Sequence, residues 1–151
     1  MNLENIKIRK LEYRDLNRSY YELLNHISNY KIEIEGTQLE KKNLFWENLN
    51  DNNIILVMTY EKQIIGTGNL LIQNKVIHNF SKIGHIEDIV IDSKFRKLGL
   101  GKKLLTEMIK YAEILGCYKC ILNCNENKKQ FYENCGLIHK EICMTIYLEQ
   151  K

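Results

Sequence analysis

Apolar residues recur along several segments of the chain with a period of two, which is typical of strands. Apolar and basic residues alternate over Ile6–Leu11, which predicts a first strand. Ile54–Tyr60 and Ile64–Ile72 are largely apolar and flank Glu61-Lys62-Gln63, which predicts two strands joined by a hairpin turn. Gly84–Asp92 predicts another strand, with a polar first half and a fully apolar second half.

Other segments repeat their apolar residues at helical spacing. Leu100–Gly116 is the clearest helix, because its apolar residues form one stripe and a glycine ends it. Apolar residues at a similar spacing follow Asp15 and predict a first helix, and Gly36-Thr37 begins a second helical stretch. Lys128–Cys135 predicts a short helix that ends at a glycine.

Three short segments complete the pattern. Val76–Phe80 is either a loop or a short strand, and Cys120–Cys124 and Ile142–Leu148 each predict a strand. The resulting order β-α-α-β-β-β-α-β-α-β predicts a mixed α/β sheet. No Gly/Ser linker, repeat or low-complexity block divides the sequence, so we expect residues 1–151 to form a single domain.

Composition narrows the class of protein. Of the 151 residues, 44% are hydrophobic and 27% charged, as in ordinary soluble globular domains. The net charge is only +3, without a basic stripe interleaved with aromatic residues, so nucleic-acid binding is not expected. The longest apolar runs are too short to cross a bilayer, and the N-terminus lacks a signal-like apolar region. We therefore expect a cytoplasmic protein.

Five cysteines lie in the last third of the chain. Cys117 and Cys120 form a CxxC pair with Cys124 four residues further on, which raises the question of a zinc site. A strand here would point these side chains to alternating faces, and no further His or Cys pair follows at metal-finger spacing. The odd number favours free thiols in a reducing compartment, with no metal.

A strand, a basic turn and a helix follow one another over residues 89–105. Gly99 and Gly101 remove Cβ atoms where backbone N–H groups could closely approach a ligand, and the helix N-terminus adds unpaired donors. Basic side chains surround the turn, namely Arg96, Lys97, Lys102 and Lys103. This pattern predicts a diphosphate-sized anion site; in the alternative interpretation the glycines only shape the turn. It is neither a Walker A loop nor a dinucleotide fingerprint.

Arg96-Lys-Leu-Gly99-Leu-Gly101 resembles the R/Q-x-x-G-x-G/A signature of the GNAT superfamily of acetyltransferases. Four blocks in order resemble the glucosamine 6-phosphate N-acetyltransferase branch of that superfamily: Gly84–Val90, Leu98–Lys102, Gly116–Cys124 and Phe131–Gly136. The resemblance covers residues 64–147. It implies a mixed, mostly antiparallel sheet flanked by helices, with acetyl-CoA bound where two parallel strands splay.

The resemblance also implies how acetyl-CoA is held. The backbone of Ile89, Val90 and Ile91 would pair with the pantetheine arm, and the turn would cradle the diphosphate. Tyr132, at the start of the last short helix, would stabilise or protonate the departing thiolate; otherwise it is an ordinary core aromatic. The implied coenzyme-binding residues are Ile89, Val90, Ile91, Arg96, Lys97, Leu98, Gly99, Leu100, Gly101, Lys102, Tyr132 and Asn134.

A second group of residues would bind the amino sugar. Glu87 and Asp88 lie at the amino-sugar site of the resembling enzymes, but neighbouring strand positions face opposite sides, so they cannot form a catalytic dyad. Lys75 and His78 would approach the sugar phosphate, although a solvated loop is the alternative. Contacts from the partner subunit imply a homodimer. The implied substrate-binding residues are Ser28, Lys75, His78, Glu87, Asp88, Tyr118, Lys119 and Asn123.

Two positions depart from the pattern of the resembling enzymes. Asn123 stands where they carry Asp; an amide cannot take a proton, although its backbone carbonyl can still accept a hydrogen bond from the amine. Tyr147 stands where an Arg usually contacts the phosphate, which weakens the case for tight phosphate binding.

The resemblance implies direct transfer to the amine of glucosamine 6-phosphate, on the route to UDP-N-acetylglucosamine. Catalytic roles would fall to Tyr132, Glu87 as the first candidate for a base, and Asn123. Three alternatives stay open: a GNAT enzyme for another amine, such as a protein N-terminus, polyamine or antibiotic; a non-catalytic acetyl-CoA-binding domain; and an interaction module without a cofactor.

Overall fold

The computed structural model describes residues 3–27 and 38–148. Its strands are β1 (Lys7–Lys10), β2 (Asn53–Tyr60), β3 (Gln63–Asn74), β4 (Lys82–Ile91) and β5 (Cys117–Ile121). Its α-helices are α1 (Arg18–Leu24), α2 (Gln38–Asn48), α3 (Ile77–Phe80), α4 (Leu100–Ile114) and α5 (Glu126–Glu133). Short 3₁₀ turns occupy Leu3–Asn5, Tyr13–Asp15 and Ser93–Phe95.

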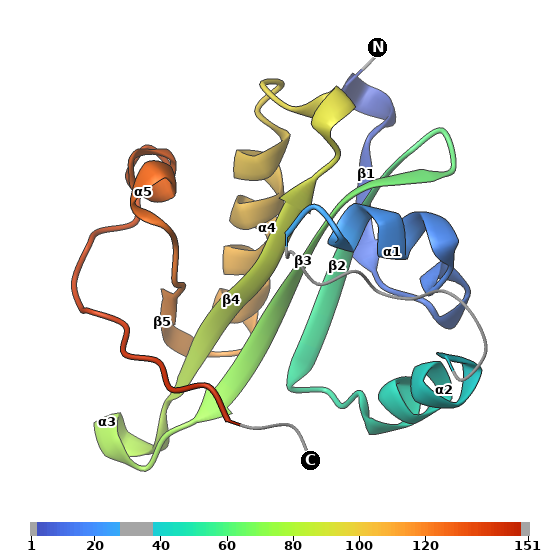
Figure 1. Ribbon diagram of the computed structural model, residues 1–151. Helices are drawn as coiled ribbons and strands as arrows, with labels where there is room; N and C mark the ends of the chain where they lie inside the picture. The colour runs from blue at the N-terminus through green and yellow to red at the C-terminus, as the bar shows by residue number, and fades with distance from the viewer. Residues whose placement is uncertain (1–2, 28–37, 149–151) are drawn as a thin grey trace.

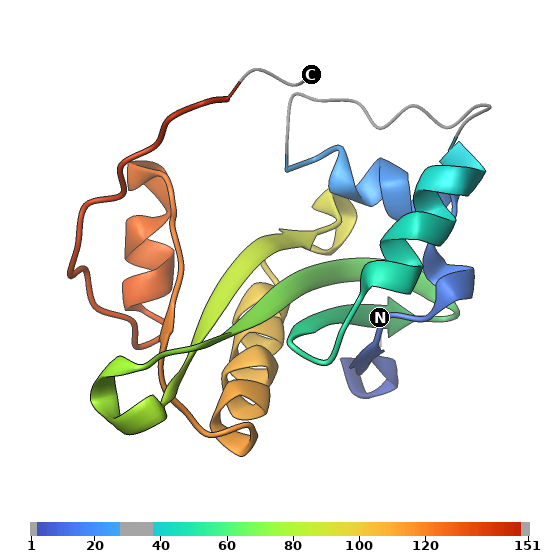
Figure 2. The same ribbon diagram turned by 90° about the horizontal axis from the view of Figure 1, so that it is seen from below.

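The strands form one sheet in the order β1-β2-β3-β4-β5 (Figure 1). Neighbours are antiparallel from β1 through β4, whereas β4 and β5 are parallel. Figure 2 shows α4 covering one face of the sheet and α1 and α2 covering the other. The prediction of a mixed, mostly antiparallel sheet flanked by helices is therefore confirmed.

Each face of the sheet has its own apolar layer. On the α4 face, Leu104, Leu105 and Met108 are fully buried against residues such as Leu56 and Leu70. On the opposite face, the buried residues are Leu11, Leu16, Tyr20, Leu23, Val57, Ile64 and Val90. The helices within residues 3–27 and 38–148 all fall short of the length and apolar character that a bilayer crossing needs.

β4 and β5 pair over only part of their lengths. The pairing runs from Lys82 with Cys117 to His85 with Ile121, and β5 ends there. Beyond His85, β4 continues to Ile91 while keeping its pairing with β3 on the other side. The edge of β4 that faces away from β3 is consequently free of a strand partner over its last residues, and β5 and α5 stand apart from it in Figure 1.

A bulge interrupts the β3–β4 ladder in the middle of β4. Thr67 pairs with Val90 but Asn69 pairs with Glu87, so Gly68 alone stands opposite Asp88 and Ile89. Asp88 has a positive φ of 52°, in the left-handed region. Such a bulge re-aims the side chains that follow it and therefore shifts the alternation of the strand by one residue.

Some elements begin or end elsewhere than predicted. The N-cap of α1 is Asn17, whose side chain accepts from the N–H groups of Ser19 and Tyr20, whereas Asp15 lies upstream and pairs with Arg9. The short strand predicted at Cys120–Cys124 begins earlier, at Cys117. Gly36-Thr37, the predicted start of the second helix, lies outside the described residues.

Two predictions about irregular segments need correction. Val76–Phe80 forms no strand, because His78, Asn79 and Phe80 all have positive φ values and make a tight left-handed turn within α3. The strand predicted over Ile142–Leu148 is wrong: this segment is extended away from the sheet without strand pairing, and Ile142 and Leu148 are 83% and 80% exposed. A strand needs a neighbour, and within the described chain this segment has none.

Candidate functional site

A cleft of about 530 Å³ opens along the unpaired end of β4, between that strand, the start of α4 and α5. We call it the β4 cleft. Its lining comprises His26, Ile27, Ile89, Val90, Ile91, Phe95, Arg96, Lys97, Gly99, Leu100, Gly101, Lys128, Phe131 and Tyr132. Most of the predicted coenzyme-binding residues are therefore brought together in one place.

The floor of the cleft is suited to an anion because backbone donors converge there. Lys97 and Gly99 both have left-handed φ values, of 64° and 74°, and Gly99 caps α4. Lys103 N–H is bonded to the Gly99 carbonyl, so the earlier N–H groups of α4 have no helical acceptor. These donors, the positive end of the helix dipole and the Lys97 side chain are the groups that suit an anion.

The two glycines of the turn serve different purposes. At Gly99 the positive φ favours glycine, because other residues rarely adopt this backbone conformation. Lack of space is not the reason, since a Cβ there would meet nothing within 4 Å. Gly101 is required by packing, since a Cβ there would lie 3.2 Å from Cζ of Phe131. Gly101 thus lets α4 and α5 come together, while the space beside Gly99 is open.

Three predicted coenzyme residues lie outside the cleft lining: Leu98, Lys102 and Asn134. Leu98 is 44% exposed. Lys102 Nζ donates to the carbonyl oxygen of Asn134 at 3.3 Å, which ties the start of α4 to the end of α5. Arg96 does line the cleft, and its Nε donates to the Ile91 carbonyl at 3.1 Å, so this side chain also fixes the turn to the end of β4.

Tyr132 lines the cleft from the last turn of α5, rather than from the start of the helix as predicted. It is half-buried, and its ring centre lies 5.0 Å from that of Phe131. Burial raises the pKa of Tyr132, and the nearby thiols of Cys124 and Cys135 raise this pKa further. The phenol is therefore protonated at neutral pH and can donate a proton into the cleft.

Sequence reasoning missed five residues that line the cleft: His26, Ile27, Phe95, Lys128 and Phe131. Lys128 adds a cation from α5 to those of Arg96 and Lys97, in a predicted helix where only Tyr132 and Asn134 had an assigned role. His26 and Ile27 follow the end of α1, and no local pattern predicts that this part of the chain reaches β4. Phe131 was identified only as part of a motif.

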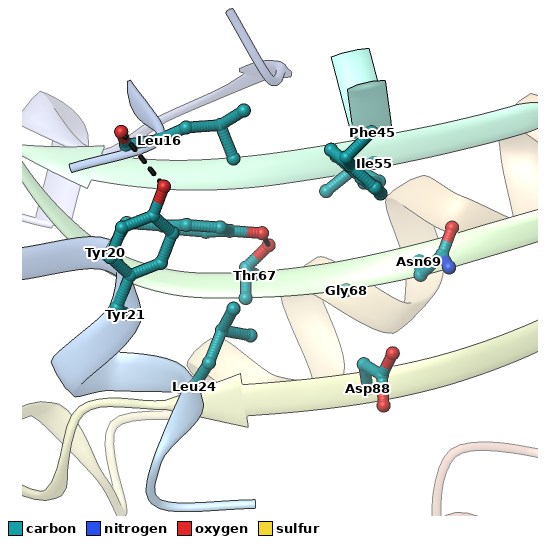
Figure 3. Close-up of a pocket in the computed structure, with 10 residues that line it drawn as sticks. All are labelled: Leu16, Tyr20, Tyr21, Leu24, Phe45, Ile55, Thr67, Gly68, Asn69 and Asp88. Atoms are coloured by element: carbon teal, nitrogen blue, oxygen red, sulfur yellow. Dashed lines mark hydrogen bonds between the residues drawn. The ribbon is translucent and has the colours of Figure 1, made fainter. Parts of the chain in front are cut away.

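A second cavity, of about 250 Å³, lies on the other face of the sheet between β3, α1 and α2 (Figure 3). We call it the α1 cavity. Its lining comprises Leu16, Tyr20, Tyr21, Leu24, Phe45, Ile55, Thr67, Gly68, Asn69 and Asp88. Tyr20 donates its hydroxyl to Thr67 Oγ1 at 3.2 Å, because the Thr67 hydroxyl is itself donated to the Leu56 carbonyl at 2.8 Å.

The bulge brings Glu87 and Asp88 to the same face. Glu87 is the cross-strand partner of Asn69, and paired residues point to one face of a sheet. Asn69 and Asp88 line the same α1 cavity. The prediction that the two carboxylates face opposite sides is therefore wrong, because simple alternation does not hold across the left-handed Asp88. The next residue, Ile89, lines the β4 cleft, so consecutive residues of β4 line the two hollows.

The other predicted acceptor residues gather at the opposite end of β4. The rings of His78 and Tyr118 stack with centres 4.7 Å apart, and Lys119 Nζ lies 5.7 Å from the Tyr118 ring centre. Lys119 is level with Ile83, and Glu87 lies four residues further along β4, roughly 13 Å at the usual rise of a strand. Within one chain, the two groups therefore lie at different positions along β4.

Asn123, Ser28 and Lys75 complete the set of predicted acceptor residues. Asn123 is exposed in the connection between β5 and α5, and Ser28 lies outside the described residues. Lys75 sits at the β3–β4 turn, where its N–H donates to the Ser81 carbonyl at 2.8 Å.

All five cysteines are free, and burial raises the pKa of Cys117 and raises that of Cys120 to about 11. Both thiols are therefore protonated at neutral pH and poor metal ligands. Among residues 3–27 and 38–148, no group of three His, Cys, Asp or Glu side chains is arranged to hold a metal ion.

Comparison with known proteins gives the chain a clear set of relatives. Residues 13–137 match the model of the acetyltransferase (GNAT) family. The chain is 36% identical to the glucosamine 6-phosphate N-acetyltransferase of Arabidopsis thaliana, over 97% of this chain and 99% of that protein. It is 33% identical to glucosamine 6-phosphate N-acetyltransferase 1 of Dictyostelium discoideum, over 96% of this chain and 92% of that protein.

The fold agrees as well. The crystal structure of the Arabidopsis thaliana enzyme superposes with a TM-score of 0.85 and 37% identity, over 95% of this chain and 99% of that one. The resemblance recognised in the sequence is therefore confirmed.

Proposed function

Because the chain belongs to the GNAT family of acetyltransferases, we propose that it transfers the acetyl group of acetyl-CoA to the amine of glucosamine 6-phosphate. The product is N-acetylglucosamine 6-phosphate, a precursor of UDP-N-acetylglucosamine. Enzymes of this family and fold use acetyl-CoA. The observation that carries the proposal is the β4 cleft, in which an unpaired strand edge, an anion site and the Tyr132 phenol meet.

The β4 cleft fits acetyl-CoA in each of its parts. The free edge of β4 at Ile89–Ile91 offers backbone groups to an extended pantetheine arm. The donors between Lys97 and Lys102 suit the diphosphate, and Lys128 adds charge from the facing helix. When bound there, acetyl-CoA supplies the thioester that is the acetyl donor.

The chain's own residues then assist direct transfer to the amine. As the new C–N bond forms and the C–S bond breaks, a backbone N–H of the β4 edge stabilises charge on the carbonyl oxygen. The protonated Tyr132 gives its proton to the departing thiolate. The amine loses its own proton to Glu87 or to water, since Glu87 lies on β4 two residues before Ile89, which lines the β4 cleft.

We propose that two copies of the chain share each acceptor site. Lys119 lies roughly 13 Å from Glu87 along β4, and His78 packs against the neighbouring Tyr118, so these side chains lie toward the other end of the strand. In a symmetric pair, they can reach the acceptor site of the partner. Two exposed features support such a pair. The apolar side chains of the 142–148 segment are exposed to water, and the free edge of β5 has unpaired backbone groups, so a second copy of the chain could bury the first and pair with the second.

The five free cysteines fit a reducing compartment, and we infer a cytoplasmic enzyme. We also infer that residues 1–151 make up one domain, because one sheet carries both hollows.

A screen of acceptor amines tests the proposal. Purified protein is mixed with acetyl-CoA and, separately, glucosamine 6-phosphate, spermidine or a peptide with a free N-terminus, and release of free thiol is followed. We expect release with glucosamine 6-phosphate far above that with the other amines. Release only with spermidine or the peptide would replace the proposed acceptor. Coenzyme binding without release from any amine would indicate a non-catalytic domain.

A further inference from the structure

The side-chain amide of Asn69 is a polar group that the fold leaves unused. Asn69 lies on β3 and lines the α1 cavity, and its Oδ1 is enclosed without a hydrogen-bond partner. The amide makes no side-chain hydrogen bond to any residue within the described ranges 3–27 and 38–148. Rotation about χ2 exchanges its oxygen and nitrogen with little change of shape, so either atom can face the cavity.

Two other polar side chains of the cavity, by contrast, have hydrogen-bond partners. Tyr20 and Thr67 form a complete chain of hydrogen bonds that ends at the Leu56 carbonyl. Asn69 therefore stands out as the unsatisfied member of the cavity wall. Figure 3 shows Asn69 on β3, beside Asp88 of the neighbouring strand β4 and at the end of the cavity away from Tyr20.

An enclosed amide without a partner lowers the stability of the folded state, and native proteins rarely keep one without reason. A ligand that supplies the missing hydrogen bond is one such reason. The position fits, because Asp88, which the sequence resemblance implies is an acceptor-binding residue, lines the same α1 cavity as Asn69. A ligand here would be the molecule that receives the acetyl group.

We propose that Asn69 is a further acceptor-binding residue, whose amide hydrogen-bonds a hydroxyl or amine of the amino sugar beside Asp88. This inference rests on the proposed function for the identity of the acceptor, but not for its location. Asn69 thereby contributes to specificity: acceptors without a polar group at this place leave the amide unpaired and bind more weakly.

The chain offers a matched control for the test. Asn53, at the start of β2, also has an enclosed Oδ1 without a partner, yet it does not line the α1 cavity. Asn69→Leu and Asn53→Leu each replace an unsatisfied amide by an apolar group of similar branching. If both amides were only structural, the two variants would behave alike.

Steady-state thiol release is measured at saturating acetyl-CoA with glucosamine 6-phosphate varied, together with melting temperatures. For Asn69→Leu we expect the acceptor KM to rise by about tenfold, as the loss of one hydrogen bond to a ligand predicts. The KM for acetyl-CoA should change less than twofold, and Asn53→Leu should keep both KM values. Should Asn69→Leu fail to fold, Asn69→Val, which suits a strand, is compared in the same way.

An acceptor KM for Asn69→Leu or Asn69→Val within twofold of the wild type would overturn the inference, as would an equal rise in Asn53→Leu. Failure of the proposed function is seen separately, in the wild type. If the wild type acetylates spermidine or a peptide instead, the variants are compared on that amine, and a selective rise for Asn69→Leu still supports the inference. A wild type that acetylates none of these amines contradicts both.

Discussion

Gly101 of α4 lies against the ring of Phe131 on α5, so closely that a Cβ on the glycine would come within 3.2 Å of Phe131 Cζ. The next residue after Phe131 is Tyr132, and the two rings are 5.0 Å apart in an edge-on arrangement. The anion site and the phenol thus lie on two helices whose separation is set by one missing methyl group.

Gly101→Ala should widen this contact and shift α5 slightly from α4. We expect the KM for acetyl-CoA to rise by about fivefold, because the added Cβ disturbs both walls of the cleft. The melting temperature should change little, since alanine gains about 1 kcal/mol in helix propensity over glycine. Thr106→Ala, on the exposed side of the same helix, is the control. An unchanged KM for acetyl-CoA in Gly101→Ala would show that the contact does not set the cleft.

Tyr132→Phe should lower kcat by roughly 100-fold or more, the usual effect of losing a general acid. The KM values and the melting temperature should stay close to those of the wild type, because the Tyr132 hydroxyl makes no hydrogen bond with another residue of the described ranges. On the alkaline side of the wild-type pH profile, kcat should stay constant up to the ordinary tyrosine pKa, since burial raises the pKa of Tyr132 above its usual value. Tyr111→Phe, on α4, serves as control; a kcat loss below threefold in Tyr132→Phe would contradict the assigned role.

Because of Tyr20, we expect the free energy of unfolding to fall at alkaline pH. Burial raises its pKa to about 12 from an ordinary value of 10, so the unfolded chain releases this proton first as the pH rises. The wild type should therefore lose roughly 2–3 kcal/mol more unfolding free energy than Tyr20→Phe between pH 10 and pH 12. Urea unfolding at pH 8 and at successive alkaline pH values measures the difference. Parallel pH dependence in both proteins would be the contrary result.

Shared sites predict that two inactive variants rescue each other. Tyr132→Phe damages the cleft, and the double variant Tyr118→Ala/Lys119→Ala damages the surface offered to the partner. When both chains are produced together, each mixed dimer should hold one intact site, giving about a quarter of wild-type activity for random pairing. Activity no greater than the sum of the two separate variants would argue against sharing.

The helix, strand and turn around the β4 cleft were predictable because a single local sequence pattern determines each of them. The apolar stripe of Leu100–Gly116 predicted α4, which ends at Ile114, and the apolar run at Ile89–Ile91 predicted the buried end of β4. The Arg96–Gly101 motif predicted the anion turn, and residues from it line the cleft. Local periodicity and turn chemistry suffice in such cases.

The failures share a cause, namely dependence on distant parts of the chain. The bulge at Asp88 arises from how β4 pairs with β3, and no local pattern reveals which residue a ladder will skip. The 142–148 segment alternates like a strand, but pairing needs a neighbouring strand, and residues 3–27 and 38–148 supply none. Lys128 reaches the cleft only because α5 packs on α4 through Gly101.

If the acceptor is a phosphorylated amino sugar, the ratio of kcat/KM for glucosamine 6-phosphate to that for glucosamine should be large, and this ratio is the measurement to make first. Charge-assisted hydrogen bonds contribute about 1.5–3 kcal/mol each, so two phosphate contacts predict a preference of at least roughly 100-fold for the phosphorylated sugar. This preference should shrink to below tenfold in Lys75→Ala/Lys119→Ala. Equal kcat/KM for the two sugars in the wild type would contradict the account, since no group of the protein would then recognise the phosphate.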